Sequence, residues 1–166
     1  MTTLSIDRHD NLAGGAFFRA VSGILSTDNS IRLTILRVVL GLVMLPHGLQ
    51  KTAGWFGGYG YTGTMGYFTS IGIPAFLAFL AIAAESVGAV ALVTGFTTRI
   101  AAFGLSVNMA VAAFMHAPNG FLMNWSGQQK GEGYEYHLLV LAITTVLMIA
   151  GGGRFSIDRL LTRGRR

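Results

Sequence analysis

PAFLAFLAIAAESVGAVALVT, residues Pro74–Thr94, is apolar almost throughout, and Glu85 is its single ionisable residue. A helix rises about 1.5 Å per residue, so this stretch is long enough to cross a hydrocarbon core of roughly 30 Å. It also lacks the polar face that a helix on the surface of a soluble protein presents to water. The stretch therefore predicts a transmembrane helix.

Three further apolar stretches flank this one, Ile31–Leu49, Ile100–Met115 and Tyr136–Ala150. The 166-residue chain is 52% hydrophobic and only 11% charged, with a mean hydropathy of +0.56. A soluble all-α bundle is the alternative interpretation, but its helices would need polar faces that these stretches do not have. We therefore predict an all-α fold, a bundle of four transmembrane helices.

The segment before the first apolar stretch has an amphipathic pattern. In AGGAFFRAVSGIL, residues 13–25, the apolar side chains fall on one helical face and Arg19 lies opposite. This pattern predicts an interfacial helix on the inner leaflet, with a frayed tail as the alternative. The expected organisation is an N-terminal cytoplasmic segment (1–30), a four-helix membrane domain (31–153) and a basic cytoplasmic tail (154–166).

The segment Thr52–Gly72 connects the first and second stretches and is rich in glycine and aromatic residues. Aromatic rings are enriched at the headgroup level of membranes. We therefore expect Thr52–Gly72 to be an outer loop that anchors the bundle at the interface.

The positive charges are distributed unevenly along the chain. Arginines cluster in the two terminal segments, and Arg99 lies between the second and third stretches, while the other two connections carry only Lys51 and Lys130. Positive residues favour the cytoplasmic side of a membrane, so both termini are expected in the cytoplasm. The basic tails are expected to contact anionic lipid headgroups rather than nucleic acid, despite the pI of about 10.1.

The chain contains no cysteine. This excludes disulfides, cysteine-ligated iron–sulfur clusters and thiolate zinc sites within it. It also excludes thiol–disulfide exchange on this chain.

Two ionisable residues are expected at membrane depth, Arg37 in the first stretch and Glu85 in the second. Such residues are functional candidates because an unpaired charge there costs about 3 kcal/mol or more. One interpretation is an Arg37–Glu85 ion pair that fixes helix packing. The other is a proton or ligand site that uses Glu85, and Asn108 could join either arrangement.

A second set of polar residues is expected at the outer ends of the helices. His47 ends the first stretch, His116 ends the third, and Glu135 and His137 open the fourth. With Lys51 they form a candidate pocket that could hydrogen-bond a quinone; haem or metal binding is the weaker alternative, because no helix has a His–x3–His pair. Histidines that merely reach the headgroups are the non-functional interpretation, and no catalytic residue is identified.

Four segments resemble the DoxX family of bacterial membrane proteins. They are LRVVLGLVMLPHGLQKTAGW (36–55), AAESVGAVALVTGFTTRIAA (83–102), GEGYEYHLLVLA (131–142) and GGGRFSIDRL (151–160). The resemblance covers roughly 31–161 and implies a four-helix inner-membrane bundle. It links the chain to a subunit of thiosulfate:quinone oxidoreductase and to membrane complexes that handle thiol and oxidative stress.

The family pattern covers several residues of this chain by position. These are Arg37, His47, Gly48, Lys51, Glu85, Arg99, Glu135 and the Gly153–Arg154 pair. His137 departs from the pattern, since an apolar residue or proline is expected there.

The leading functional hypothesis is a quinone-interacting membrane subunit of a redox or oxidative-stress system, with electrons supplied by a partner protein. One alternative is a non-catalytic membrane protein that docks other membrane or redox proteins. Another is a small-solute or metal transporter, which would need a homo-oligomer because four spans are few. The sequence leaves open whether the chain is an enzyme.

Overall fold

The computed structural model describes residues 20–163, and this part of the chain is helical with no strand. Most of the predicted interfacial helix lies outside the described residues, although residues 20–25 are helical. The elements that follow are α2 (Ile31–Thr52), η1 (Trp55–Gly57), α3 (Gly60–Ser70), α4 (Ala75–Thr94), α5 (Thr98–His116), η2 (Ala117–Asn119), α6 (Glu135–Ala150) and α7 (Ile157–Thr162). The all-α prediction is confirmed.

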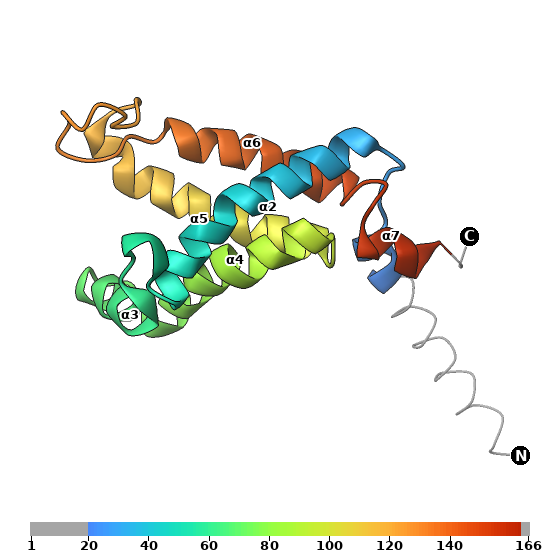
Figure 1. The fold of residues 1–166 in the computed structure, drawn as a ribbon, viewed down its shortest axis with the longest axis horizontal. Helices are drawn as coiled ribbons and strands as arrows, with labels where there is room; N and C mark the ends of the chain where they lie inside the picture. The colour runs from blue at the N-terminus through green and yellow to red at the C-terminus, as the bar shows by residue number, and fades with distance from the viewer. Residues whose placement is uncertain (1–19, 164–166) are drawn as a thin grey trace, which may run out of the picture.

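Four apolar helices form the bundle (Figure 1). α2 packs along α4, α4 and α5 form a hairpin, and α5 packs along α6, which also meets α2. By length and composition, α2, α4 and the helical stretch that α5 begins can each cross a membrane, whereas α6 is a shorter apolar helix of 16 residues. The four apolar stretches of the sequence therefore match the four helices of the bundle.

Apolar side chains lie on the outside of the bundle as well as in its core. Leu92, Leu105 and Leu147 are fully buried between the helices. Large apolar side chains also point outward, with Val87 68% and Ile149 72% exposed. A soluble protein rarely exposes contiguous apolar patches of this kind, so the outer surface of the bundle fits contact with lipid.

Two glycines bring α2 and α4 into close contact. A Cβ atom added to Gly48 would lie 2.6 Å from the Glu85 carbonyl oxygen, and one added to Gly41 would lie 2.7 Å from Val93 Cγ2. Small residues at helix crossings allow this approach in lipid, where packing rather than hydrophobicity drives helix association. The two contacts set the register of the antiparallel α2–α4 pair.

The segment predicted as an outer loop contains a helix, α3, which is packed against α2 and α4. Its glycines at positions 60, 63 and 66 give it a low intrinsic helix propensity, which is why the sequence indicated a loop. Thr64 is the residue that α3 buries. Tertiary packing on the ends of α2 and α4 therefore overrides local propensity.

The short helix α7 folds back against the opposite end of the bundle from α3 (Figure 1). Both carboxylate oxygens of Asp158 accept backbone N–H groups at the start of α5, from Thr97 at 2.6 Å and Thr98 at 2.8 Å. Thr97 gives α5 no side-chain cap of its own. The buried Asp158 therefore caps α5 from a distant part of the sequence.

Candidate functional site

Glu85 lies at the centre of a polar cluster made by three helices. Its Oε2 atom is 2.5 Å from Lys51 Nζ on α2, and its Oε1 atom accepts a hydrogen bond of 2.7 Å from Asn108 Nδ2 on α5. Glu85 itself is only 5% exposed. Among residues 20–163 this is the only ion pair. We call these three residues the Glu85 cluster.

The position of Lys51 follows from the packing of α2. Gly48 lies directly against the backbone of Glu85 and Ser86. Lys51 comes three residues later, and residues three apart share a helix face. Its side chain therefore emerges beside the Glu85 carboxylate. Gly48 thus permits the approach, and Lys51 supplies the charge that neutralises the buried acid.

His116 and His137 meet next to this cluster. Their rings are stacked with centroids 5.1 Å apart, which joins the end of α5 to the start of α6. His137 is buried, and within residues 20–163 its Nδ1 atom lies near the Tyr134 backbone but has no partner with full hydrogen-bond geometry. His116 is half-buried. A buried, unpartnered ring nitrogen is unusual in folded proteins, and it leaves an atom that can bond a ligand.

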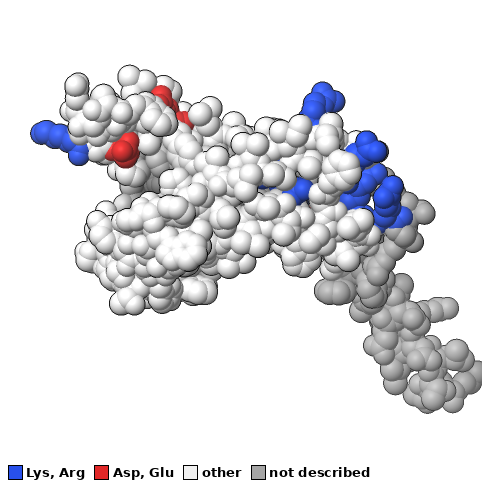
Figure 2. All heavy atoms as spheres, viewed as in Figure 1, with Lys and Arg blue, Asp and Glu red and all other residues white. Residues whose placement is uncertain are grey.

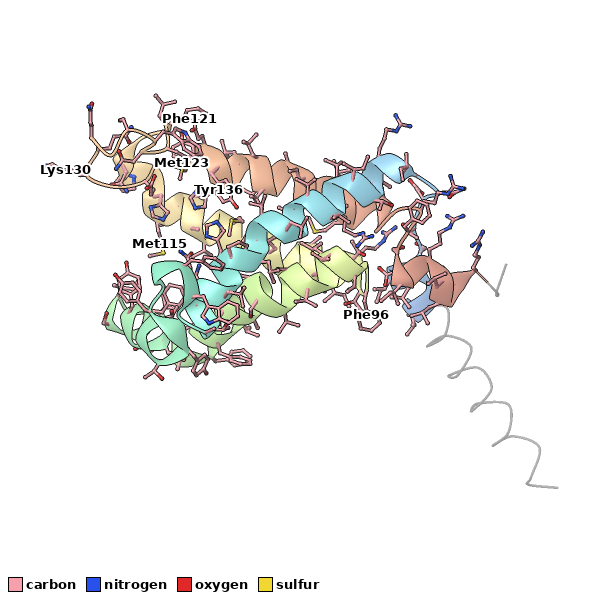
Figure 3. All side chains as sticks on the ribbon, in the orientation of Figure 1. Phe96, Met115, Phe121, Met123, Lys130 and Tyr136 are labelled. Atoms are coloured by element: carbon pink, nitrogen blue, oxygen red, sulfur yellow. The ribbon has the colours of Figure 1, made fainter. Side chains whose placement is uncertain are left out.

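Tyr136 connects the histidines to α2. Its ring lies 5.8 Å from that of His137 and 6.1 Å from that of His47, between centroids. Its hydroxyl donates to Met44 Sδ at 3.3 Å, and Figure 3 shows the residue near the start of α6. The carboxylate of Glu85 is near enough to interact electrostatically with both Tyr136 and His137. Polar groups from all four bundle helices therefore form one band.

Glu135 faces away from this band. Its Oε1 atom accepts hydrogen bonds from Trp125 Nε1 at 2.9 Å and from the backbone N–H of Met123 at 3.2 Å. Both donors belong to the connection between η2 and α6, whose residues Phe121, Met123 and Lys130 are labelled in Figure 3. Through these two hydrogen bonds, Glu135 fixes the connection between η2 and α6 to the start of α6.

The candidate metal ligands do not gather into a metal site. The candidates were His47, His116, Glu135 and His137. Of these, His116 and His137 stack on each other, while His47 lies beside Tyr136 and Glu135 bonds Met123 and Trp125. Within residues 20–163, no group of three or more His, Cys, Asp or Glu side chains is placed to hold an ion.

Arg37 does not pair with Glu85, contrary to one interpretation of the sequence. Its guanidinium donates to four backbone carbonyls, those of Leu92, Val93 at 2.7 Å, Gly152 at 2.9 Å and Phe155 at 2.6 Å. The α2–α4 register places Arg37 beside the end of α4 rather than beside Glu85. There it satisfies two carbonyls of the last turn of α4, which have no partner within that helix, and two carbonyls of the connection between α6 and α7.

Arg99 has a similar role at the end of α6. Its Nη1 atom donates to the Met148 carbonyl at 2.9 Å, and its Nε donates to the Ser26 carbonyl at 3.2 Å. Arg37 and Arg99 therefore each donate to a carbonyl at the end of a helix, and neither belongs to the Glu85 cluster. Sequence reasoning missed these roles and that of Asp158, because only the fold brings the partners together.

The chain was compared with known proteins. The sequence model of the DoxX family matches residues 32–118. The chain is 32% identical over 126 residues to the "Inner membrane protein YqjF" of Escherichia coli (strain K12), covering 76% of this chain and 92% of that protein. It is 29% identical over 135 residues to the "Putative oxidoreductase CatD" of Bacillus subtilis (strain 168), covering 80% and 88%.

No solved structure gives a significant match to this chain. The family match spans more than half of the sequence and includes almost all of α2, the whole of α4 and α5, and all three residues of the Glu85 cluster. The YqjF relative extends the likeness over three quarters of the chain. The chain therefore belongs to the DoxX family of membrane proteins.

Proposed function

We propose that this protein is a quinone-interacting subunit of a redox or oxidative-stress system in the bacterial inner membrane. The observation that carries the proposal is the band of ionisable and hydrogen-bonding groups that joins the Glu85 cluster to Tyr136 and the stacked histidines. An ionisable group at membrane depth marks a functional site by default. The oxidoreductase in the name of the Bacillus subtilis relative supports a redox role.

The proposal places four helices across the membrane, with both termini in the cytoplasm. Figure 2 supports this orientation, because most blue side chains gather at the end of the molecule where α7 lies. The exposed or half-buried cations of that end include Arg32, Arg99, Arg154, Arg159 and Arg163. The other end carries Lys130 among acidic side chains. Positive charge favours the cytoplasmic side, and the relative named as an inner membrane protein supports the inner membrane.

In this proposal the band binds the quinone ring and moves protons. Reduction of a quinone to a quinol takes up two electrons and two protons. In the proposed reaction, His137 Nδ1 and the half-buried His116 hydrogen-bond the ring oxygens, and Glu85 with Lys51 passes protons toward them. The chain has no cysteine and so no cysteine-ligated iron–sulfur cluster, and in this proposal the electrons come from a partner oxidoreductase.

Quinone binding can be measured with the chain's own fluorescence. Trp55 and Trp125, the only two tryptophans, both lie in the connections at the α3 end of the bundle. The purified protein is titrated with a short-chain ubiquinone analogue, and quenching of tryptophan emission gives the Kd. We expect saturable quenching that weakens about tenfold or more in His137→Phe and in Glu85→Gln. Lys130→Gln, far out on the connection between η2 and α6, is the matched control and should bind as the native protein does.

Two outcomes would count against this function. One is quenching that rises linearly with quinone and never saturates, which is the behaviour of partition into detergent. The other is a Kd that does not change in either band variant.

A second function, the docking of another membrane or redox protein, is favoured by one surface. Leu122 and Trp125, in the connection between η2 and α6, are 60% and 84% exposed. Recovery of a co-purifying protein from native membranes with the native chain, and its loss in Leu122→Asp, would support docking. Equal recovery from both would argue against a role of this surface.

A further inference from the structure

A shallow cavity of about 380 Å³ lies at the arginine-rich end of the bundle, far from the Glu85 cluster. Three arginines line it, Arg154, Arg159 and Arg163, and they come from α7 and the residues on either side of it. Apolar side chains of Phe155 and Leu160 complete the wall. The volume falls within the usual range of about 300–1,000 Å³ for small-ligand sites.

The three arginines have no acidic partner within the described part of the chain. The only ion pair of residues 20–163 is Lys51–Glu85, at another site. Asp158 lies between Ile157 and Arg159, but both its oxygens are taken by the N–H groups of Thr97 and Thr98. The guanidinium of Arg154 lies over an aromatic ring, with Cζ 5.5 Å from the centre of the Phe155 ring. Among residues 20–163, therefore, no carboxylate pairs with the positive charge that the cavity presents.

The cavity has an apolar side next to its positive side. Leu160 is 68% exposed and Phe155 is 63% exposed. Thr94, the last residue of α4, also lines the cavity, so the cavity adjoins the end of a bundle helix. A ligand that fits would carry clustered negative charge together with hydrocarbon, which is the chemistry of a phospholipid at the membrane surface.

We propose that this cavity binds the headgroup of an anionic phospholipid with two phosphodiester groups, of the cardiolipin type. Guanidinium groups bind phosphate oxygens in a bidentate manner, and three of them match more than one phosphate. Basic pockets at the ends of membrane helices on the cytoplasmic side suit such headgroups. Leu160 and Phe155 contact the start of the acyl chains. The lipid then holds α7 against the end of the bundle.

The test uses the full chain, delipidated in a non-ionic detergent and titrated with lipid, with adducts counted by native mass spectrometry. We expect one retained cardiolipin per chain, weaker retention of phosphatidylglycerol and little of phosphatidylethanolamine. Each arginine near the surface contributes about fivefold to such binding, so replacing all three with glutamine should weaken it on the order of a hundredfold. Arg32→Gln, a cation at the same end but outside the cavity, is the matched control and should retain the lipid.

Two further arms separate a lipid site from a general anion site. Inorganic phosphate should not displace cardiolipin at equal concentration, and Leu160→Gln should weaken cardiolipin binding several-fold with all arginines present. The proposal is overturned if the triple variant retains cardiolipin as the native chain does, or if inorganic phosphate displaces the lipid. Because these side chains are at least partly exposed, the variants should fold, and an unchanged melting temperature in lipid-free detergent checks this.

Discussion

At the scale of single residues, the packing of the bundle depends on the partners of one buried acid, Glu85. Glu85 is 5% exposed and bonds both Lys51 and Asn108. A carboxylate buried among apolar helices without such partners would be strongly unfavourable. The ion pair therefore stabilises the arrangement of α2, α4 and α5 as well as forming the centre of the proposed site.

Removing Lys51 should destabilise the protein more than removing both charges. Lys51→Met leaves the Glu85 carboxylate without its cation, and we expect a loss near the lower end of about 3–5 kcal/mol, because Lys51 is partly exposed. The double variant Lys51→Met, Glu85→Leu should recover part of this loss. Thermal unfolding in detergent measures the cycle, with Lys130→Met as the control. Additive effects of the two single changes would contradict a direct interaction.

Gly48 offers a second prediction at this scale. A Cβ in Gly48→Ala would lie 2.6 Å from Glu85 O, so α2 must move away from α4, at a cost of about 1–3 kcal/mol. Gly66→Ala is the matched control, since nothing lies within 4 Å of its added Cβ. That change should be neutral or stabilising by up to about 1 kcal/mol. Equal melting temperatures of Gly48→Ala and the native protein would refute the close contact.

At the scale of elements, α7 acts as a clamp on the end of the bundle. Asp158→Asn keeps the shape of the side chain, but an amide cannot accept both the Thr97 and Thr98 N–H groups as a carboxylate does. We expect a loss of about 1–2 kcal/mol and faster hydrogen exchange at the start of α5. Asp28→Asn, exposed and without a side-chain bond among the described residues, should leave exchange there unchanged. If both variants exchange alike, α5 does not depend on the cap.

The elements differ in how far the sequence predicts them. Hydrophobic length alone locates α2, α4, α5 and α6 to within a few residues, because a membrane helix must be apolar on every side. α3 is missed, since its glycines weaken the helical signal and only packing on α2 and α4 holds it.

The site shows the same limit. Polar residues in apolar stretches identify Lys51, Glu85 and His137 as candidates, and their grouping depends on the helix register. Gly41 and Gly48 set that register through their contacts with α4. The rise per residue along the predicted helices placed Arg37 and Glu85 at a similar depth in the membrane. The glycine contacts instead align α2 with α4 so that Arg37 lies beside the end of α4. A single sequence does not show which of its small residues lie at a contact between two helices.

At the scale of the whole molecule, the charge distribution predicts the orientation in the membrane. The native chain has no cysteine, so single cysteines can be introduced at two opposite ends of the bundle, at Lys130 and at Arg163, which directly follows α7. In intact cells a membrane-impermeant maleimide should label Lys130→Cys and should label Arg163→Cys only after the membrane is permeabilised. Labelling of Arg163→Cys in intact cells would reverse the proposed orientation.

The central claim is that the band of polar groups around Glu85 binds a quinone, and photochemical labelling tests it most directly. A quinone that carries an aryl azide is irradiated in native membranes, and the labelled peptides are mapped by mass spectrometry. We predict labels on the second half of α2 and the first turns of α6, near Lys51, Tyr136 and His137, which excess ubiquinone analogue prevents. Labels spread over the lipid-facing residues such as Val87 and Ile149, or labels that excess quinone does not reduce, would contradict the claim.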